Sequence, residues 1–331
     1  MNFKEPVFCC VKRYKMPFFE SFSDNSSDSF SCTSGDRAEK VKTKMPSEDK
    51  KHMSVALIGD LHINPASSEK QLGFLKKHLG EIRPDLVIIH GDLVDSAEYI
   101  DDKKCRKMLI RELKTCSEVA KTVGVLGNHD IVLASALKGR KKKKPEFFSE
   151  AEEKWKKIFN EAGAKLLVDE WFEMGKLRIF GFFQDEKCLV KGEKAQGNFL
   201  EIRKKIELLK KDRKLTTEAG KVNWFVSHIP IEELVSMKEL KGFELFSFGH
   251  THGGCVPVGV DRIVDKIGWN GGVISPRKKL FPKKQTRGVE ILPNRARVIV
   301  NSGMTGIGTT AYLPFQYLNP LKAAEIGVVE F

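Results

Sequence analysis

Five short stretches of the sequence place aspartate, asparagine and histidine directly after apolar runs, mostly beside glycine. They read GDLH (59–62), HGDLVD (90–95), GNHD (127–130), SHIP (227–230) and GHTH (249–252). Carboxylate, amide and imidazole groups are ligands that proteins offer to divalent metal ions. The candidate ligands are Asp60, His62, Asp92, Asn128, His228, His250 and His252. A single aspartate at such a place more often caps a helix, so the metal prediction depends on the whole set.

Short apolar runs alternate with amphipathic stretches between and around these motifs. Strands are expected at 55–59, 86–90, 123–127, 165–168, 176–183, 222–228 and 243–250. Helices are expected at 69–79, 103–120, 150–162 and 195–211, and a hairpin about Pro293–Asn294. The alternation predicts an α/β fold with a buried, mostly parallel sheet.

The polar stretches follow the carboxyl-terminal ends of the expected strands, which line one crevice in an open α/β sheet. We therefore expect the candidate ligands to converge on two metal ions that share one carboxylate, with Asp92 as the bridge. Such a metal pair holds a phosphoryl group and activates water, which predicts hydrolysis of a phosphate ester or anhydride. Gly59, Gly91, Gly127 and Gly249 are expected to let the backbone turn sharply before the next residue.

In order and residue type, these stretches resemble the calcineurin-like metallophosphoesterase superfamily. The resemblance implies a four-layer αββα sandwich. It implies that Asp60, His62, Asp92 and His252 hold one metal ion, and that Asp92, Asn128, His228 and His250 hold the other. It also implies that His129 binds phosphate or protonates the leaving oxygen, with Asp130 orienting it. The mixed ligand set suits Mn²⁺, with Fe or Zn²⁺ as alternatives.

Residues 53–331, including SFGHTHGG (247–254), are similar to a membrane-associated branch of bacterial phosphoesterases. This branch includes the YaeI-like enzymes and the chlamydial-type UDP-2,3-diacylglucosamine pyrophosphatases of lipid A synthesis. The similarity implies release of UMP and 2,3-diacylglucosamine 1-phosphate from a nucleotide-linked glycolipid, although LKAAE (321–325) stands where that branch ends in Pro-Pro-Glu.

The alternative function is that of a broad-specificity phosphodiesterase or nuclease, since a net charge of +13 also suits binding to a nucleic acid. No nucleic-acid-binding module is recognisable. A non-catalytic scaffold would have lost ligands, and none is lost.

The composition is that of a globular chain, with 331 residues of which 41% are hydrophobic and 31% charged. Residues 1–50 lack an apolar period and predict a flexible leader before one catalytic domain, 51–331. Seven scattered cysteines favour a reducing, cytoplasmic compartment, and no apolar run is long enough to span a bilayer.

Two segments mix basic and apolar residues: KGRKKKKPEFF (138–148) and RKKLFPKK (277–284). They predict peripheral docking on the anionic inner face of the membrane, with solvated loops as the alternative.

Overall fold

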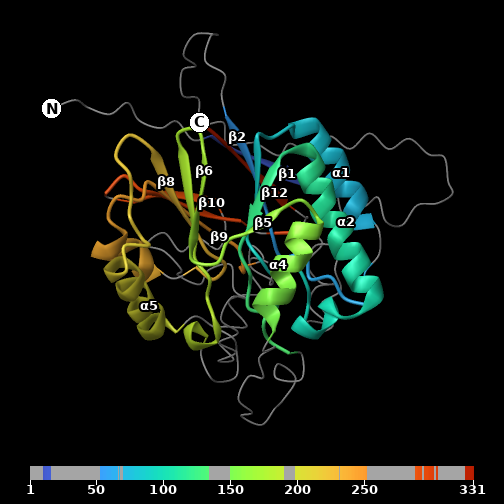
Figure 1. Cartoon of the computed structure of the whole chain (residues 1–331). Coiled ribbons are helices and arrows are strands. Elements are labelled where there is room, and N and C mark those ends of the chain that lie inside the picture. The colour runs from blue at the N-terminus through green and yellow to red at the C-terminus, as the bar shows by residue number, and fades with distance from the viewer. Residues whose placement is uncertain are drawn as a thin grey trace, which may run out of the picture.

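The computed structural model describes residues 10–15, 53–133, 150–189, 198–251, 288–304 and 325–331, except residues 66, 68, 69, 231, 293 and 302. These residues form two six-stranded sheets that lie face to face between outer layers of helices (Figure 1). The expected α/β sandwich is confirmed. Both sheets are mixed: antiparallel strands lie at one edge of the first sheet and at both edges of the second.

The first sheet has the strand order β1-β12-β2-β3-β4-β5. Its parallel strands are β2 (Ser54–Ile58), β3 (Leu86–Ile89), β4 (Lys121–Gly124) and β5 (Lys165–Leu166). The apolar runs in β2 and β3 are buried, as is typical of parallel strands covered on both faces. Strand β12 (Glu325–Glu330) pairs antiparallel with β2, and β1 (Cys10–Lys15) pairs antiparallel with β12.

The second sheet has the strand order β10-β11-β9-β8-β7-β6. Its parallel strands are β7 (Leu177–Gly181), β8 (Val222–Val226), β9 (Leu245–Phe248) and β11 (Arg297–Val300). Strands β6 (Glu170–Met174) and β10 (Gly288–Ile291) pair antiparallel at the two edges. The antiparallel β10–β11 pair confirms the expected hairpin.

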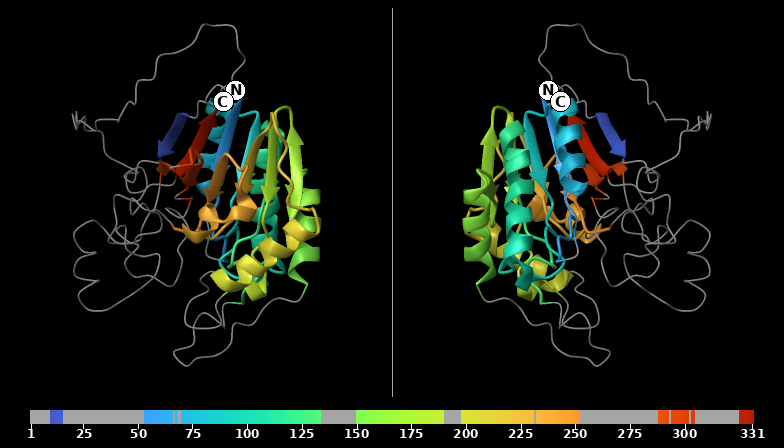
Figure 2. Two further views of the ribbon diagram at one scale, coloured as in Figure 1. Left: turned by 90° about the vertical axis from the view of Figure 1, so that its left-hand side faces the viewer. Right: turned by 90° about the vertical axis from the view of Figure 1, so that its right-hand side faces the viewer.

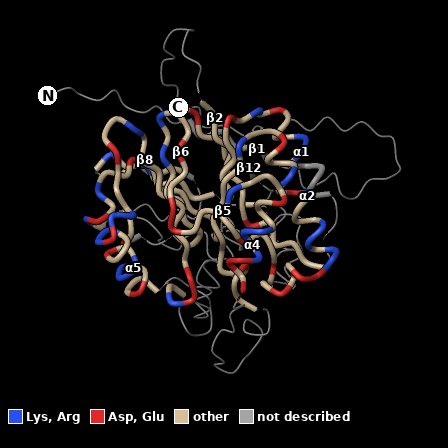
Figure 3. Tube along the Cα trace, in the orientation of Figure 1, with Lys and Arg blue, Asp and Glu red and all other residues tan. Residues whose placement is uncertain are grey.

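Helices cover the outer faces of both sheets (Figures 1 and 2). Helices α1 (Lys70–Ile82), α2 (Lys103–Val119) and α4 (Ala151–Glu161) lie on the first sheet, and α5 (Phe199–Lys211) lies on the second. The side chain of Asp102 caps α2 by accepting a hydrogen bond from Cys105 N at 2.9 Å. Charged residues lie mainly on these outer layers (Figure 3). Among the described helices, none has both the length and the apolarity needed to cross a membrane.

An apolar layer fills the space between the sheets, with Leu57 and Ile88 from the first sheet and Ile179 and Trp224 from the second. A polar contact crosses this layer. Ser247 Oγ on β9 accepts a hydrogen bond from Trp224 Nε1 at 2.8 Å and lies 2.8 Å from His90 Nε2, which follows β3. This buried hydrogen bond between Ser247 and His90 fixes the two sheets relative to each other close to the polar stretches.

The structure differs from the expected leader in one segment. Cys10–Lys15 form β1, which pairs along its whole length with β12. Backbone hydrogen bonds to a neighbouring strand hold this segment, and they leave little trace in its composition. The rest of residues 1–50 and both basic segments, 138–148 and 277–284, lie outside the described residues.

Candidate metal centre

The first two polar stretches run side by side beyond the ends of β2 and β3. The backbone N–H of Asp60 donates to Gly91 O at 2.8 Å, and the N–H of His62 donates to Asp92 O at 3.0 Å. An isolated parallel bridge between Ile63 and Val94 continues this pairing. The two loops therefore extend the parallel sheet and hold their polar side chains in a fixed register.

Four candidate ligands have backbone angles in the left-handed region. Their φ values are 53° for Asp60, 48° for His62, 51° for Asp92 and 66° for His250. Such a conformation costs roughly 1–3 kcal/mol for a residue with a side chain, and it concentrates at functional sites. Of the glycines that precede these residues, Gly91 has such an angle as expected, with a φ of 88°, whereas Gly59 and Gly249 do not. Asp60 and His250 adopt the unusual angle themselves.

Glycines also make room for the side chains of the candidate ligands. A Cβ atom on Gly127 would lie 2.1 Å from Asp92 Oδ1, and one on Gly303 would lie 2.5 Å from Asp60 Oδ2. A side chain at Gly127 or at Gly303 would therefore displace the carboxylate of a candidate ligand. Gly91 has a left-handed backbone, with a φ of 88°, and also lacks room for a side chain: a Cβ atom there would lie 2.3 Å from Gly127 N.

Asp92 lies at the centre of the site. Its Oδ2 is 3.5 Å from His62 Nε2 and 3.1 Å from His228 Nε2, while its Oδ1 accepts a hydrogen bond from His129 N at 2.9 Å. Burial alone would raise the pKa of Asp92, but His228 and His129 hold it well below the usual carboxyl range. A carboxylate between two imidazole nitrogens is the arrangement expected for a group that bridges two metal ions.

Two histidines turn Nε2 toward Asp92 because Nδ1 is engaged elsewhere. His228 Nδ1 donates to the carbonyl oxygen of His90 at 2.6 Å, and His62 Nδ1 is 3.3 Å from Asp95 Oδ1. A proton on Nδ1 leaves the lone pair of Nε2 available, which is how metal-binding histidines are held. Burial disfavours a charged His228, but Asp92 and Asp60 outweigh it and raise its pKa to about 9. A metal ion that binds at Nε2 must therefore displace the second proton of the ring.

His250 joins the cluster from the second sheet. Its Nδ1 lies 3.2 Å from His228 Nε2, and its backbone N–H donates to Asp60 Oδ1 at 3.0 Å. Burial, together with the charge of His228, lowers the pKa of His250 to about 3. A neutral imidazole is the form that binds a metal ion.

His129 borders the same cluster and is the more accessible histidine. Its side chain is 20% exposed, whereas that of His62 is 1% exposed. The two rings meet edge to face with centroids 4.7 Å apart, and His129 Nδ1 donates to the carbonyl oxygen of Asp95 at 2.8 Å. The ring is therefore oriented by a backbone carbonyl through Nδ1.

Asp130 has a different role from the one expected for it. Its Oδ1 accepts hydrogen bonds from Leu93 N at 2.8 Å and Val94 N at 3.2 Å, and its Oδ2 accepts one from Gly127 N at 2.8 Å. Asp130 thus joins the loops that carry Asp92 and Asn128, while the Asp95 carbonyl orients His129. Burial and the nearby Asp92 charge raise the pKa of Asp130 to about 7.

Asn128 supplies a test of whether the cluster fits a metal ion. Its Oδ1 atom is buried without a hydrogen-bond partner, and a buried amide oxygen of this kind needs an explanation. Combinations of Asp60, His62, Asp92, His228 and His250 place their ligand atoms within 4.8 Å of one another. Nitrogen and oxygen donors with a free amide oxygen beside them fit two divalent metal ions. The seventh candidate, His252, lies outside the described residues.

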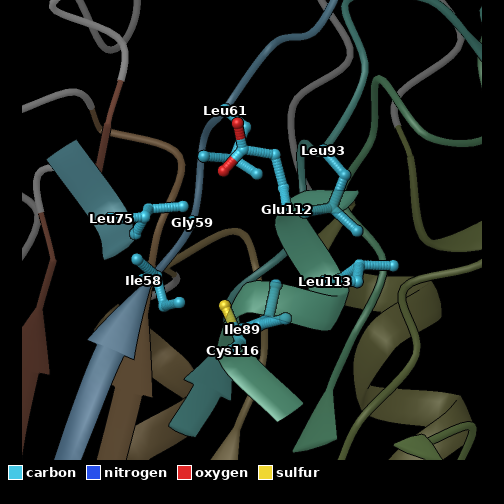
Figure 4. Close-up of a pocket in the computed structure, with 9 residues that line it drawn as sticks. All are labelled: Ile58, Gly59, Leu61, Leu75, Ile89, Leu93, Glu112, Leu113 and Cys116. Atoms are coloured by element: carbon cyan, nitrogen blue, oxygen red, sulfur yellow. The ribbon is translucent and has the colours of Figure 1, made fainter. Parts of the chain in front are cut away.

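A second buried acid lies behind the ligand loops. Glu112 on α2 shares a small apolar pocket with Leu61 and Leu93, which adjoin candidate ligands, and with Ile58 and Leu113 (Figure 4). The residue is 1% exposed, and neither side-chain oxygen has a hydrogen-bond partner. Burial raises the pKa of Glu112 to about 8, although Arg111 opposes the shift. The acid is therefore mostly protonated at neutral pH.

Sequence reasoning identified the charged and imidazole groups of the site but not their supports. It did not identify Gly303, the carbonyl groups of His90 and Asp95, or the position of Glu112. A backbone carbonyl leaves no signal in the residue type. The signal for Glu112 was a carboxyl on the apolar face of the helix expected at 103–120.

A family comparison agrees with this geometry. The sequence profile of the calcineurin-like phosphoesterases matches residues 53–254, which is more than half of the chain and includes all five polar stretches. The chain belongs to the calcineurin-like phosphoesterase family. As a member, it is a metal-dependent phosphoester hydrolase, and its site is compatible with two divalent metal ions.

Solved structures similar to this calcineurin-like phosphoesterase share little of its sequence. A dimetal phosphatase from Danio rerio is 14% identical, with 76% of this chain and 87% of that chain covered at a TM-score of 0.42. A nuclease, MPE, from Pseudomonas putida is 17% identical, with 62% and 64% covered at 0.30. A purple acid phosphatase from yellow lupin seeds is 13% identical, with 61% and 38% covered at 0.36. No curated protein sequence matches the chain.

Proposed function

We propose that the cluster is the dinuclear centre of a pyrophosphohydrolase. In this assignment one metal ion is held by Asp60, His62, Asp92 and His252, and the other by Asp92, Asn128, His228 and His250. The observation that carries it is the position of Asp92 Oδ2, 3.5 Å from His62 Nε2 and 3.1 Å from His228 Nε2. The two ions would supply positive charge for the phosphoryl oxygens and would lower the pKa of a water molecule.

The residues around the ions then have separate tasks. His129 contacts the substrate and protonates the leaving oxygen, because its ring is partly exposed and is held through Nδ1. Asp95 fixes His62 through its carboxylate and His129 through its carbonyl. Asp130 keeps the loops of Asp92 and Asn128 together. The protein thus orients each reacting group before substrate arrives.

The proposed substrate is a nucleotide-linked glycolipid, UDP-2,3-diacylglucosamine. Water adds to one phosphorus of the pyrophosphate, the bridging phosphorus–oxygen bond breaks, and UMP and 2,3-diacylglucosamine 1-phosphate leave. The similarity of residues 53–331 to the glycolipid-cleaving branch supports this choice. The net charge of +13 supports it as well, since it favours an anionic substrate at an anionic surface. We place the protein in the cytoplasm, peripheral on the inner face of the membrane, with Mn²⁺ as the metal.

A broad-specificity phosphodiesterase or nuclease is the second candidate. The same net charge of +13 favours it, because contacts with phosphates dominate the affinity for nucleic acids. Cleavage of DNA or RNA that weakens steeply with added salt would support this function. Liposome flotation with and without anionic lipid tests whether the protein docks on an anionic membrane. Equal flotation with both kinds of liposome would reject the membrane proposal.

The deciding experiment is a substrate panel with the Mn²⁺-loaded full chain. UDP-2,3-diacylglucosamine should yield UMP and the acylated sugar phosphate, and Asp92→Asn should abolish the reaction. Asparagine keeps the shape of Asp92 and tolerates its left-handed backbone, so only the charge is removed. Good turnover of oligonucleotides without turnover of the glycolipid would reject the proposed substrate. Hydrolysis retained by Asp92→Asn with two bound metal ions would reject the proposed centre.

A further inference from the structure

A buried amide holds the backbone beside His228. Gln184 lies in the loop after β7 and is 3% exposed. Its Oε1 accepts a hydrogen bond from Ile229 N at 2.7 Å, and its Nε2 donates to Ile229 O at 3.2 Å. One side chain therefore satisfies both backbone groups of a single residue, as a neighbouring strand would.

Ile229 directly follows His228, so these two bonds restrict His228 as well. The imidazole ring of His228 is held separately, because its Nδ1 donates to His90 O at 2.6 Å. Together the ring contact and the backbone contact fix the direction of Nε2, which lies 3.1 Å from Asp92 Oδ2. A shift of Ile229 would turn Nε2 away from Asp92.

The loop that carries Gln184 is itself anchored on both sides. Lys205 of α5 donates to Phe183 O at 2.6 Å and lies 2.9 Å from Asp185 Oδ2. Asp169 Oδ1 accepts a hydrogen bond from Phe183 N at 3.0 Å, and its other oxygen lies 2.8 Å from Lys205 Nζ. Both neighbours of Gln184 are thus tied to partly buried charged groups, which restrict the position of the amide.

We propose that Gln184 is a positioning residue that sets the orientation of His228 in the metal centre. The proposal rests on the proposed function of His228 as a metal ligand. Groups that orient a metal ligand typically change metal affinity by about 10–100-fold when they are removed. Gln184 acts through the backbone of Ile229 and contacts neither metal nor substrate.

The chain offers a matched control at the opposite end of β8. Asn223 is a buried amide that is 2% exposed. Its Oδ1 accepts a hydrogen bond from Glu218 N at 3.1 Å, and its Nδ2 donates to Glu218 O at 3.0 Å. Asn223 therefore makes the same pair of bonds to one backbone residue, but far along the strand from His228. Asn223 Nδ2 also donates to Lys221 O at 3.3 Å and to Glu244 Oε2 at 3.4 Å, so its loss removes at least as many contacts from the fold as the loss of Gln184.

The test compares Gln184→Leu and Asn223→Leu with the unaltered full chain. Metal-depleted proteins are titrated with Mn²⁺ alone, and thermal unfolding is recorded in parallel. We expect Gln184→Leu to bind one Mn²⁺ about 10–100-fold more weakly, while Asn223→Leu keeps the affinity of the unaltered chain although both variants lose stability. Equal affinity in Gln184→Leu and the unaltered chain would overturn the proposal, as would an equal loss in both variants.

A second variant covers the case in which Gln184→Leu does not fold. Gln184→Met has a side chain of similar length and no charge, and it removes both bonds to Ile229 with little change in volume, so the same loss of affinity is expected. An unchanged affinity in a folded Gln184→Met would then count against the proposal. If the unaltered chain binds fewer than two Mn²⁺ ions, the proposed dinuclear centre is wrong, whatever the Gln184 variants show. Failure of the dinuclear proposal can thus be told apart from failure of the Gln184 proposal.

Discussion

At the scale of single residues, the proposed centre separates side chains that would hold metal from one that would meet the substrate. The side chain of His129 is 20% exposed, and its Nδ1 is engaged by the Asp95 carbonyl. We predict that His129→Gln lowers turnover by about 10²–10⁴-fold, the usual contribution of a general acid, and leaves the bound metal content unchanged. Steady-state kinetics and elemental analysis on the same samples measure both.

The control for this prediction is His78→Gln. His78 Nδ1 lies 2.9 Å from the exposed Glu81 on α1, away from the cluster, so turnover should stay the same. If His129→Gln loses a metal ion, His129 is a ligand and its role as acid is wrong.

Glu112 gives a prediction about pH. Burial raises its pKa from 4.5 to about 8 in the folded protein. Between these values the folded state keeps the proton that the unfolded chain has released, so the free energy of unfolding falls as pH rises. The slope is at most about 1.4 kcal/mol per pH unit, and it ends above the folded pKa. Glu112→Gln cannot ionise and should remove this part of the slope.

Urea unfolding of both proteins across this pH window measures the difference. The exposed Glu118→Gln on the same helix is the matched control and should follow the unaltered protein. Parallel pH profiles for Glu112→Gln and the unaltered protein would show that Glu112 is not the buried neutral acid described above.

At the scale of elements, the ligand loops depend on glycines for space. Gly127→Ala would bring a Cβ to 2.1 Å from Asp92 Oδ1, so Asp92 must move. We predict a loss of about 1–3 kcal/mol of stability, as for overpacked sites, and more than about tenfold weaker Mn²⁺ binding, because the displaced carboxylate is the proposed bridging ligand. Chemical denaturation and metal titration measure the two effects.

Gly80→Ala in α1 is the opposite case. No atom lies within 4 Å of the added Cβ, and alanine favours a helix over glycine by about 0.5–1 kcal/mol. This variant should be more stable and should bind metal normally. Normal metal binding in Gly127→Ala would mean that the loop is not tightly packed around Asp92.

The elements that the sequence predicted best are those buried on both faces. The runs at 55–59 and 86–90 correspond to β2 and β3, since a covered parallel strand is apolar at almost every position. Strands β1, β6 and β12 were not predicted. Strands β1 and β6 lie at sheet edges, where backbone pairing with one neighbour holds a segment whose sequence shows no clear period.

The same reasoning explains which parts of the site were predictable. Metal chemistry restricts ligands to a few residue types, so Asp92 and His228 stand out in the sequence. Gly303 acts by lacking a side chain, and Gln184 acts on a backbone 45 residues away. Asp130 has the expected residue type but a different partner. Such supports depend on the folded geometry, which residue type and spacing do not specify.

At the scale of the whole molecule, the candidate ligands are divided between the two sheets. Asp60 and Asp92 follow β2 and β3, whereas His228 and His250 follow β8 and β9. Bound metal ions would therefore connect the two halves of the sandwich. The folded state gains stability from any ligand that the unfolded chain does not bind.

We predict that Mn²⁺ raises the midpoint of thermal unfolding. Above the dissociation constant, each tenfold increase in free Mn²⁺ should add about 1.4 kcal/mol per bound ion. Differential scanning fluorimetry across a series of Mn²⁺ concentrations measures the shift, and Asp92→Asn should show almost none. An unaltered protein whose midpoint does not respond to Mn²⁺ would contradict the proposed link between the sheets.

The place of β12 has a consequence for biosynthesis. Strand β12 is inserted between β1 and β2, so the earliest and the latest described segments are neighbours in one sheet. A ribosome releases β1 long before β12. Until residues 325–330 emerge, the β2 edge stays open and β1 lacks the strand with which it pairs. A nascent polypeptide stalled shortly before this point would present that open edge to chaperones, even with its catalytic residues already translated.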